Sequence, residues 1–243
     1  MSVVAILASC SIVLLGSLTQ GVTGFGFALV AVPILVHFAD PKSVVVVVLI
    51  LSAILNFMIL LQARRHVILS DAGPIVLGTV LGVPFGTYLL LAISSEELKL
   101  LVAVLILIFA VPMLLGYSRT FRHVRTASVA VGLVSGALQS STSMGGPPVV
   151  LFMAAQEVEK RNFRGTLVLR SVAASTLSVL ALVPSGLVTS DVLIQVLYLA
   201  PTMIIGFVAG SRLLGLVPDA AFRKLVLILI AATAVSTLVS SFF

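Results

Sequence analysis

Long apolar runs separated by short polar breaks cover almost the whole chain. A helix needs about 20 apolar residues to cross roughly 30 Å of hydrocarbon; six of the runs reach that length and four are shorter. The runs fall at about 2–18, 24–38, 43–62, 72–92, 98–117, 126–140, 146–155, 166–184, 189–212 and 221–243. Because apolar residues are continuous within each run and do not alternate as in barrel strands, the pattern predicts an all-α polytopic membrane protein.

Two polar phrases lie beside the short runs and share one frame. QGVTGFG occupies 20–26 and QSSTSMG occupies 139–145. Three identities are each separated by 119 residues: Gln20 and Gln139, Thr23 and Thr142, Gly26 and Gly145. Each phrase with its two flanking runs is predicted to form a helix–break–helix hairpin, which is either re-entrant or made of short, kinked spanning helices.

The similarity continues beyond the two phrases, which indicates two copies of one unit. Ser52 and Asn56 match Ser171 and Ser175, again 119 residues apart. Two later segments have counterparts as well: GVPFGTYLL (82–90) resembles GFVAGSRLL (206–214), and LKLLVAVLILIFAV (98–111) resembles FRKLVLILIAATAV (222–235).

The predicted repeats are 1–118 and 125–243, each a hairpin plus three transmembrane helices, joined by a basic cytoplasmic linker at 119–124. Such a unit enters the membrane on one side and leaves on the other, so the two copies would face opposite ways. Inverted repeats with discontinuous helices are typical of secondary transporters, which bind substrate near the membrane midplane between the repeats. The two breaks are therefore predicted to meet in one site.

The distribution of Lys and Arg supports this map. When loops alternate between sides and each hairpin returns to its own side, 11 basic residues fall on one side and 2, Lys42 and Lys99, on the other; Arg170, inside a run, completes the total of 14. The richer side holds Arg64, Arg65, Arg119, Arg122, Arg125, Lys160, Arg161, Arg164, Arg212, Arg223 and Lys224. This bias marks that side as cytoplasmic and predicts that both termini lie outside.

Composition restricts the class of protein further. Charged residues make up 9% of the chain and hydrophobic residues 60%, whereas a soluble domain carries roughly 25% charged residues. The net charge of +6 reflects the cytoplasmic loops, so no nucleic-acid partner is expected. The single Cys10 excludes an internal disulfide and a cysteine metal site. No basic residue precedes the first run, which is interpreted as a membrane element and not as a cleavable signal peptide.

The repeated phrases hold the candidate substrate site. Glycine lets the backbone turn and approach a ligand closely, and the helices that begin after the breaks offer partial positive charge and free N–H groups to an anion. Neutral polar side chains add further donors. The alternative is that these small residues serve close helix packing. The predicted substrate-binding residues are Gln20, Thr23, Gly24, Gly26, Asn56, Gln139, Ser140, Ser141, Thr142, Ser143, Gly145, Gly146, Arg170 and Ser175.

Ionisable residues indicate the sign of the substrate. Arg170 is the only one well inside a run, and it either reaches the substrate or extends to the cytoplasmic face. All eight acidic residues fall in loops or at the ends of runs, which argues against a cation site or a buried proton relay. The three histidines have no metal-binding spacing, so neither a metal nor a cofactor is expected. The pairs Ser52/Asn56 and Ser171/Ser175 either line the same cavity or bond helices to one another.

A Gly-rich break followed by an apolar helix with a proline (GFGFALVAVP, 24–33), repeated as SMGGPPVVLF (143–152), resembles the sulfite exporter TauE/SafE family of membrane permeases. The resemblance covers essentially the whole chain. It implies transport of sulfite or of small organosulfonates such as sulfoacetate, usually across a bacterial inner membrane. The chain departs from the family pattern, which often shows three successive glycines, because the first break reads Gly-Phe-Gly and the second has two glycines.

The leading hypothesis is a secondary transporter, and not an enzyme, for a small sulfur-containing anion such as sulfite or an organosulfonate. No nucleotide phosphate loop is present, so ATP is not the direct driver. The alternatives are an uptake permease for another small anion or sulfur compound, and an intramembrane enzyme, for which the runs offer no clustered catalytic side chains. We expect a multi-pass protein of the bacterial inner membrane whose partners are the anion and the lipid bilayer; a homodimer is left open.

Overall fold

The computed structural model describes residues 3–63, 69–114, 123–156 and 160–213. Within these ranges the chain is helical and contains no strand, so the predicted all-α class is confirmed. The elements are α1 (Val3–Thr23), α2 (Phe27–Leu35), α3 (Pro41–Ala63), α4 (Leu69–Ala92), α5 (Ser95–Leu114), α6 (Val124–Thr142), α7 (Gly146–Ala155), α8 (Lys160–Leu182), the short 3-10 helix η2 (Val183–Ser185) and α9 (Ser190–Leu213). The last predicted run, 221–243, lies outside the described residues.

Five of the described helices are long and apolar enough to cross a membrane. They contain the stretches Ala5–Thr23, Pro41–Gln62, Ala72–Ala92, Gly165–Ser185 and Ser190–Leu213. The chain is therefore a polytopic membrane protein. Four of these five stretches coincide with long apolar runs predicted from the sequence.

The remaining helix, α1, corrects the length expected for the first run. The hydrophobic pattern places its end near residue 18, but α1 continues to Thr23, and α6 likewise continues to Thr142. The polar residues do not end α1, because Thr23 Oγ1 donates to the carbonyl oxygen of Thr19 one turn earlier at 2.9 Å and Gln20 Nε2 donates to a side chain of α3. Each break is therefore shorter than the polar phrase that contains it.

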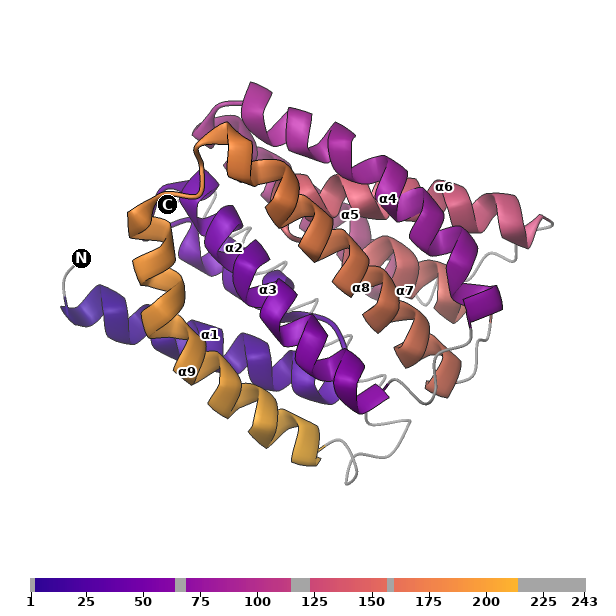
Figure 1. The fold of residues 1–243 in the computed structure, drawn as a ribbon, viewed down its shortest axis with the longest axis horizontal. Helices are drawn as coiled ribbons and strands as arrows, with labels where there is room; N and C mark the ends of the chain where they lie inside the picture. Colours follow the sequence, from indigo (N-terminus) through magenta and orange to yellow (C-terminus); the bar gives the residue numbers. More distant parts are fainter. Residues whose placement is uncertain (1–2, 64–68, 115–122, 157–159, 214–243) are drawn as a thin grey trace.

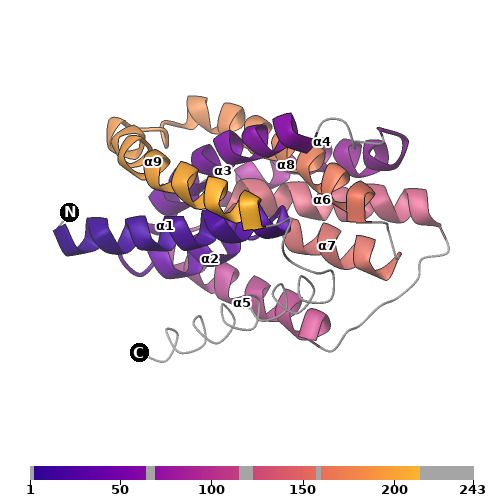
Figure 2. The same cartoon turned by 90° about the horizontal axis from the view of Figure 1, so that it is seen from below.

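Three residues separate the two helices of each hairpin. In the first break, 24–26, Gly24 and Gly26 have φ of 82° and 106°; in the second, 143–145, Ser143 has φ of 62°. Left-handed residues of this kind commonly end a helix. Figure 2 shows α1 with α2 and α6 with α7 entering from opposite ends of the view, with both breaks near the middle. Both polar phrases thus contain a helix break, as the sequence predicts.

Helices from the two halves of the chain are paired crosswise. α4 packs along α6, and α9 packs along α1, while α3 and α8 lie side by side in the middle of the bundle (Figure 1). By the sequence repeat, α6 is the counterpart of α1 and α9 is the counterpart of α4, so the two crosswise pairs are equivalent. Glycines permit the close approach: a Cβ on Gly82 would overlap Leu133 O of α6, and one on Gly210 would overlap Leu18 O of α1.

Replacing Gly82 by alanine is expected to lower the stability of the folded protein by roughly 1–3 kcal/mol. The added methyl group would overlap the backbone of α6, which yields only if the two helices move apart. Gly73 supplies the matched control, because it lies in the same helix and a Cβ there meets nothing within 4 Å apart from its chain neighbours; its alanine variant should cost much less stability than Gly82→Ala, through its contact with Pro74 alone. Thermal unfolding in detergent measures both, and equal midpoints would contradict the close packing of α4 on α6.

Candidate functional site

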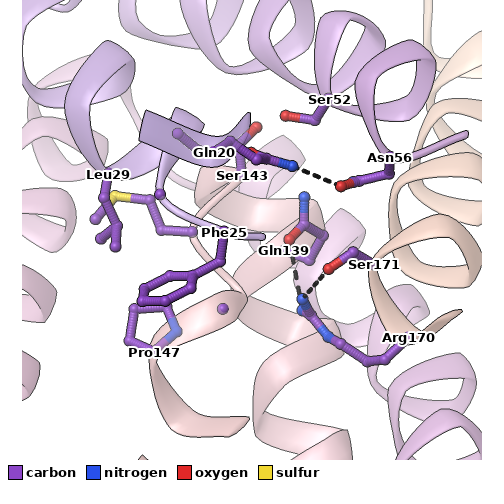
Figure 3. Close-up of a pocket in the computed structure, with 14 residues that line it drawn as sticks. Gln20, Phe25, Leu29, Ser52, Asn56, Gln139, Ser143, Pro147, Arg170 and Ser171 are labelled. Atoms are coloured by element: carbon purple, nitrogen blue, oxygen red, sulfur yellow. Dashed lines mark hydrogen bonds between the residues drawn. The ribbon is translucent and has the colours of Figure 1, made fainter. Parts of the chain in front are cut away.

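A cavity lies where the two hairpins meet, between the breaks and the middle of α3 and α8 (Figure 3). About 30 Å³ of it is open to the centres of water-sized groups, which is room for roughly two water molecules. Apart from the half-buried Gly146, the residues around it are buried, so the cavity lies inside the helix bundle. Its walls are formed by Gln20, Phe25, Gly26, Ala28, Leu29, Ser52, Asn56, Gln139, Ser143, Met144, Gly146, Pro147, Arg170 and Ser171.

Both halves of the chain contribute equivalent positions to this cavity. Four pairs of lining residues are each separated by 119 residues: Gln20 and Gln139, Phe25 and Met144, Ala28 and Pro147, Ser52 and Ser171. The two hairpins also come close together there, since a Cβ built on Gly146, the first residue of α7, would lie 3.7 Å from Phe25 Cδ2. The structure therefore brings two segments far apart in the sequence to a single place.

Equivalent side chains hold the backbone of the two breaks in the same way. Thr23 Oγ1 accepts the N–H of Phe25 at 3.2 Å, and Thr142 Oγ1 accepts the N–H of Met144 at 3.3 Å. The glutamine one turn earlier in each helix acts similarly. Gln20 Oε1 accepts the N–H of Phe27 at 3.2 Å, and Gln139 Oε1 accepts the N–H of Gly145, also at 3.2 Å. These four N–H groups at the two breaks are thus bonded within the protein and are not free for an anion.

Arg170 lies in the cavity wall and is 1% exposed, so its side chain does not extend to a surface. Its Nη1 donates to Ser171 Oγ at 3.2 Å, and its Nη2 donates to Ser135 O at 3.1 Å and to Gln139 Oε1 at 3.4 Å. All these acceptors are neutral. Its Nε is buried and has no hydrogen-bond partner among the described residues. The guanidinium thus has no counter-ion in the part of the chain that the structure describes.

Gly145 makes room for this arginine. A Cβ at that position would overlap both Arg170 Nη2 and the carbonyl oxygen of Ser135. Ser135 Oγ in turn donates to the carbonyl oxygen of Gly145 at 2.5 Å. The second break, the end of α6 and the arginine of α8 therefore form one connected polar group, although Gly145 itself does not line the cavity.

The described acidic residues lie away from the cavity. Asp40, between α2 and α3, accepts hydrogen bonds from the Ser43 backbone at 2.9 Å and from Ser95 Oγ at 2.7 Å, and so connects the start of α3 to α5. Partial burial raises the pKa of the Asp40 carboxyl, but these hydrogen bonds outweigh that effect and lower its pKa below the ordinary value. Four acidic residues whose exposure the structure describes are exposed at helix ends: Asp40, Glu96, Glu97 and Asp191.

A chain of hydrogen bonds crosses from one half of the protein to the other. Gln20 Nε2 donates to Asn56 Oδ1 at 2.6 Å, and Asn56 Nδ2 donates to Ser175 Oγ at 3.4 Å. Ser175 Oγ donates to the carbonyl oxygen of Ser171 at 2.6 Å. Asn56 and Ser175 occupy equivalent positions 119 residues apart, and they contact each other directly.

Half of the predicted site residues line the cavity and half lie behind it. The lining group is Gln20, Gly26, Asn56, Gln139, Ser143, Gly146 and Arg170. The group behind it is Thr23, Gly24, Ser140, Ser141, Thr142, Gly145 and Ser175. Two of the latter serve helix structure, since Ser140 Oγ donates to Val83 O of α4 and Ser141 Oγ donates to Ala137 O, both at 2.8 Å.

The apolar residues of the cavity wall were not among the predicted substrate-binding residues. Phe25, Ala28, Leu29, Met144 and Pro147 line the cavity beside the polar residues. Phe25 and Met144 lie inside the two repeated phrases, at equivalent positions, so the repeat itself was a signal for them. Ser52 and Ser171, for which lining and interhelical bonding were both open, line the cavity, and Ser171 also bonds Arg170.

A polytopic bundle of helices, with a buried basic side chain beside two broken helices, is the architecture of a membrane permease. Residues 9–237 match the family described as sulfite exporter TauE/SafE, and the chain belongs to this family. Its members are membrane transporters of sulfite and related sulfur anions. No curated protein and no solved structure matches the chain. No group of His, Cys, Asp or Glu among the described residues is arranged to hold a metal.

Proposed function

We propose that this protein is a secondary permease that moves a small sulfur-containing anion, bound in the cavity between the two breaks. The main support for this proposal is the burial of Arg170, whose side chain is 1% exposed and has no counter-ion among the described residues. An unpaired charge in a low-dielectric interior costs several kcal/mol. An anion in the cavity would remove most of that cost, so the cavity favours an anion as its ligand.

One buried positive charge matches one negative charge. Arg170 is the only basic residue in the cavity wall, and the other polar groups there are neutral amides and hydroxyls. Ser52 and Asn56 have polar atoms that can donate hydrogen bonds to the substrate's oxygens. A singly charged oxyanion, such as hydrogensulfite or a sulfonate, would satisfy the guanidinium without bringing surplus charge into the membrane. The alternative is that the same site binds another small anion, one whose central atom is not sulfur.

We infer that the two halves are inverted repeats. The crosswise pairs α1 with α9 and α4 with α6 are equivalent under the repeat, as are the lining pairs of the cavity. Asn56 and Ser175 are equivalent residues and are hydrogen-bonded to each other. Equivalent residues meet only close to the twofold axis that relates two inverted copies, so this bond is expected if the halves are inverted repeats. Alternating access would then require the hairpins of the two halves to exchange their packing around a site that stays between them.

The direct test is flux into proteoliposomes. Purified protein should take up labelled sulfite or methanesulfonate far faster than empty liposomes or liposomes with the Arg170→Met variant. Labelled sulfate, which is doubly charged, should enter poorly, because it brings more negative charge than the single arginine balances, and labelled phosphate is measured alongside it. Uptake of phosphate but of no sulfur anion would instead support the alternative anion permease. Absence of flux for all four anions, with the protein correctly inserted, would reject the proposal.

The topology is tested by labelling single cysteines in intact cells, after replacement of Cys10 by alanine. Cysteines at His66, His123 and Lys160 are expected to resist an impermeant maleimide, because these positions belong to the basic, cytoplasmic side. A cysteine at Lys99, on the opposite side, should react and serves as the control. Labelling of the first three without lysis would reverse the orientation, and with it the placement of both termini outside the bacterial inner membrane.

A further inference from the structure

The cavity has two unlike walls. Figure 3 shows Phe25, Leu29 and Pro147 on one side, and Asn56, Arg170 and Ser171 on the other. A small anion that is bound by hydrogen bonds all around does not need an apolar wall, because contact with one would strip off water without replacing it. An anion with a charged head and a short apolar group would use both walls.

We propose that Phe25 determines how large a substituent the transported anion can carry. This inference rests on the proposed anion permease and adds a specificity-determining residue to it. Phe25 comes from the first break, is 5% exposed, and lines the cavity. Its ring lies close to the second hairpin, since a Cβ built on Gly146, the first residue of α7, would lie 3.7 Å from Phe25 Cδ2. The ring therefore bounds the apolar side of the cavity where the two hairpins meet.

The backbone holds Phe25 in this position. The hydroxyl oxygen of Thr23 accepts the N–H of Phe25. Gly24 and Gly26 on either side have positive φ, a conformation that other residues rarely adopt. A ring fixed in this way sets a sharp limit on length. Met144, its counterpart in the second break, has a flexible side chain that adapts to the shape of a substituent.

Phe25→Ala is expected to shift selectivity toward longer substituents. The probes are methane-, ethane-, propane- and butanesulfonate, which carry the same charge and differ only in apolar length. Each is tested as a competitor of labelled sulfite uptake into proteoliposomes. With the parent protein, competition should weaken as the chain lengthens. With Phe25→Ala, it should instead strengthen by about fourfold for each methylene that the enlarged cavity buries.

Phe27→Ala is the matched control. Phe27 is two residues away and 0% exposed, but it does not line the cavity. Its loss should weaken the fold and leave the order of the four sulfonates unchanged. Phe25→Leu provides a milder variant that keeps an apolar wall with less reach; it should favour a chain length between those of the parent and the alanine variant, and it carries the test if the alanine variant does not fold.

The outcomes separate this inference from the proposed function. If the parent transports sulfite but both Phe25 variants keep the parental order of competitors, Phe25 does not set the limit, and the anion permease stands. If Phe27→Ala changes the order as much as Phe25→Ala does, general loosening is the cause and the inference is overturned. If no anion enters through the parent, the proposed function fails and this inference fails with it.

Discussion

Replacing Arg170 by methionine is expected to abolish anion transport while leaving the protein as stable as the parent or more so. Loss of one partner of a buried charge pair costs about 3–5 kcal/mol, which corresponds to a roughly 100- to 4,000-fold loss of substrate affinity. The apo protein gains, since apolar replacement of buried charges is often stabilising by about 1–4 kcal/mol. Flux in proteoliposomes and thermal unfolding in detergent measure the two effects separately.

Arg170→Lys should retain partial transport. Lysine keeps the charge but not the planar pair of nitrogens that reaches Ser171 through Nη1 and Ser135 through Nη2. A methionine variant that is destabilised and still transports at the parental rate would show that Arg170 serves packing. A methionine variant that is both inactive and unfolded would leave lysine as the informative change, and a lysine variant with no activity at normal stability would assign the role to guanidinium geometry.

Replacing Ser143 by aspartate is expected to abolish transport as well. Ser143 lines the cavity, and its hydroxyl donates to Val45 O of α3 at 3.0 Å. A carboxylate there would repel the substrate in a setting with little water and would compete for the guanidinium of Arg170. A loss of at least 100-fold in the rate of uptake at low substrate concentration is expected.

Ser143→Asn is the matched control for this charge. Asparagine has the shape of aspartate, lacks its charge, and tolerates the left-handed backbone of Ser143, whose φ is 62°. Ser143→Gly removes only the hydroxyl and its hydrogen bond to Val45 O, and should lower the free energy of unfolding by about 0.5–1.5 kcal/mol. If the folded aspartate variant transports as fast as the asparagine variant, the substrate does not approach the second break. Thr142, an equivalent choice from sequence, is a poorer test because it bonds Leu138 O and the Met144 N–H and does not line the cavity.

Several features of the site could be predicted from the amino-acid sequence. The two phrases at 20–26 and 139–145 do contain helix breaks that adjoin one cavity. Arg170 stood out as the one ionisable residue well inside an apolar run. The sequence left open whether its side chain points to the substrate or extends to the cytoplasmic face. A side chain of that length can reach either, and the choice depends on acceptors contributed by α6, which no local pattern reveals.

The sequence by itself determined the helices and their breaks. In a membrane each spanning segment must satisfy its own backbone hydrogen bonds, so hydropathy marks the helices, and glycine with polar residues marks where they stop. Only the tertiary structure decided which faces point into the cavity. Thr23 and Thr142 turn back onto the break backbone, and Phe25 and Met144 turn inward. Which residues line the cavity depends on how the two hairpins meet each other and helices α3 and α8, since the neighbours that bury a residue come from distant parts of the chain and are not specified by the local sequence.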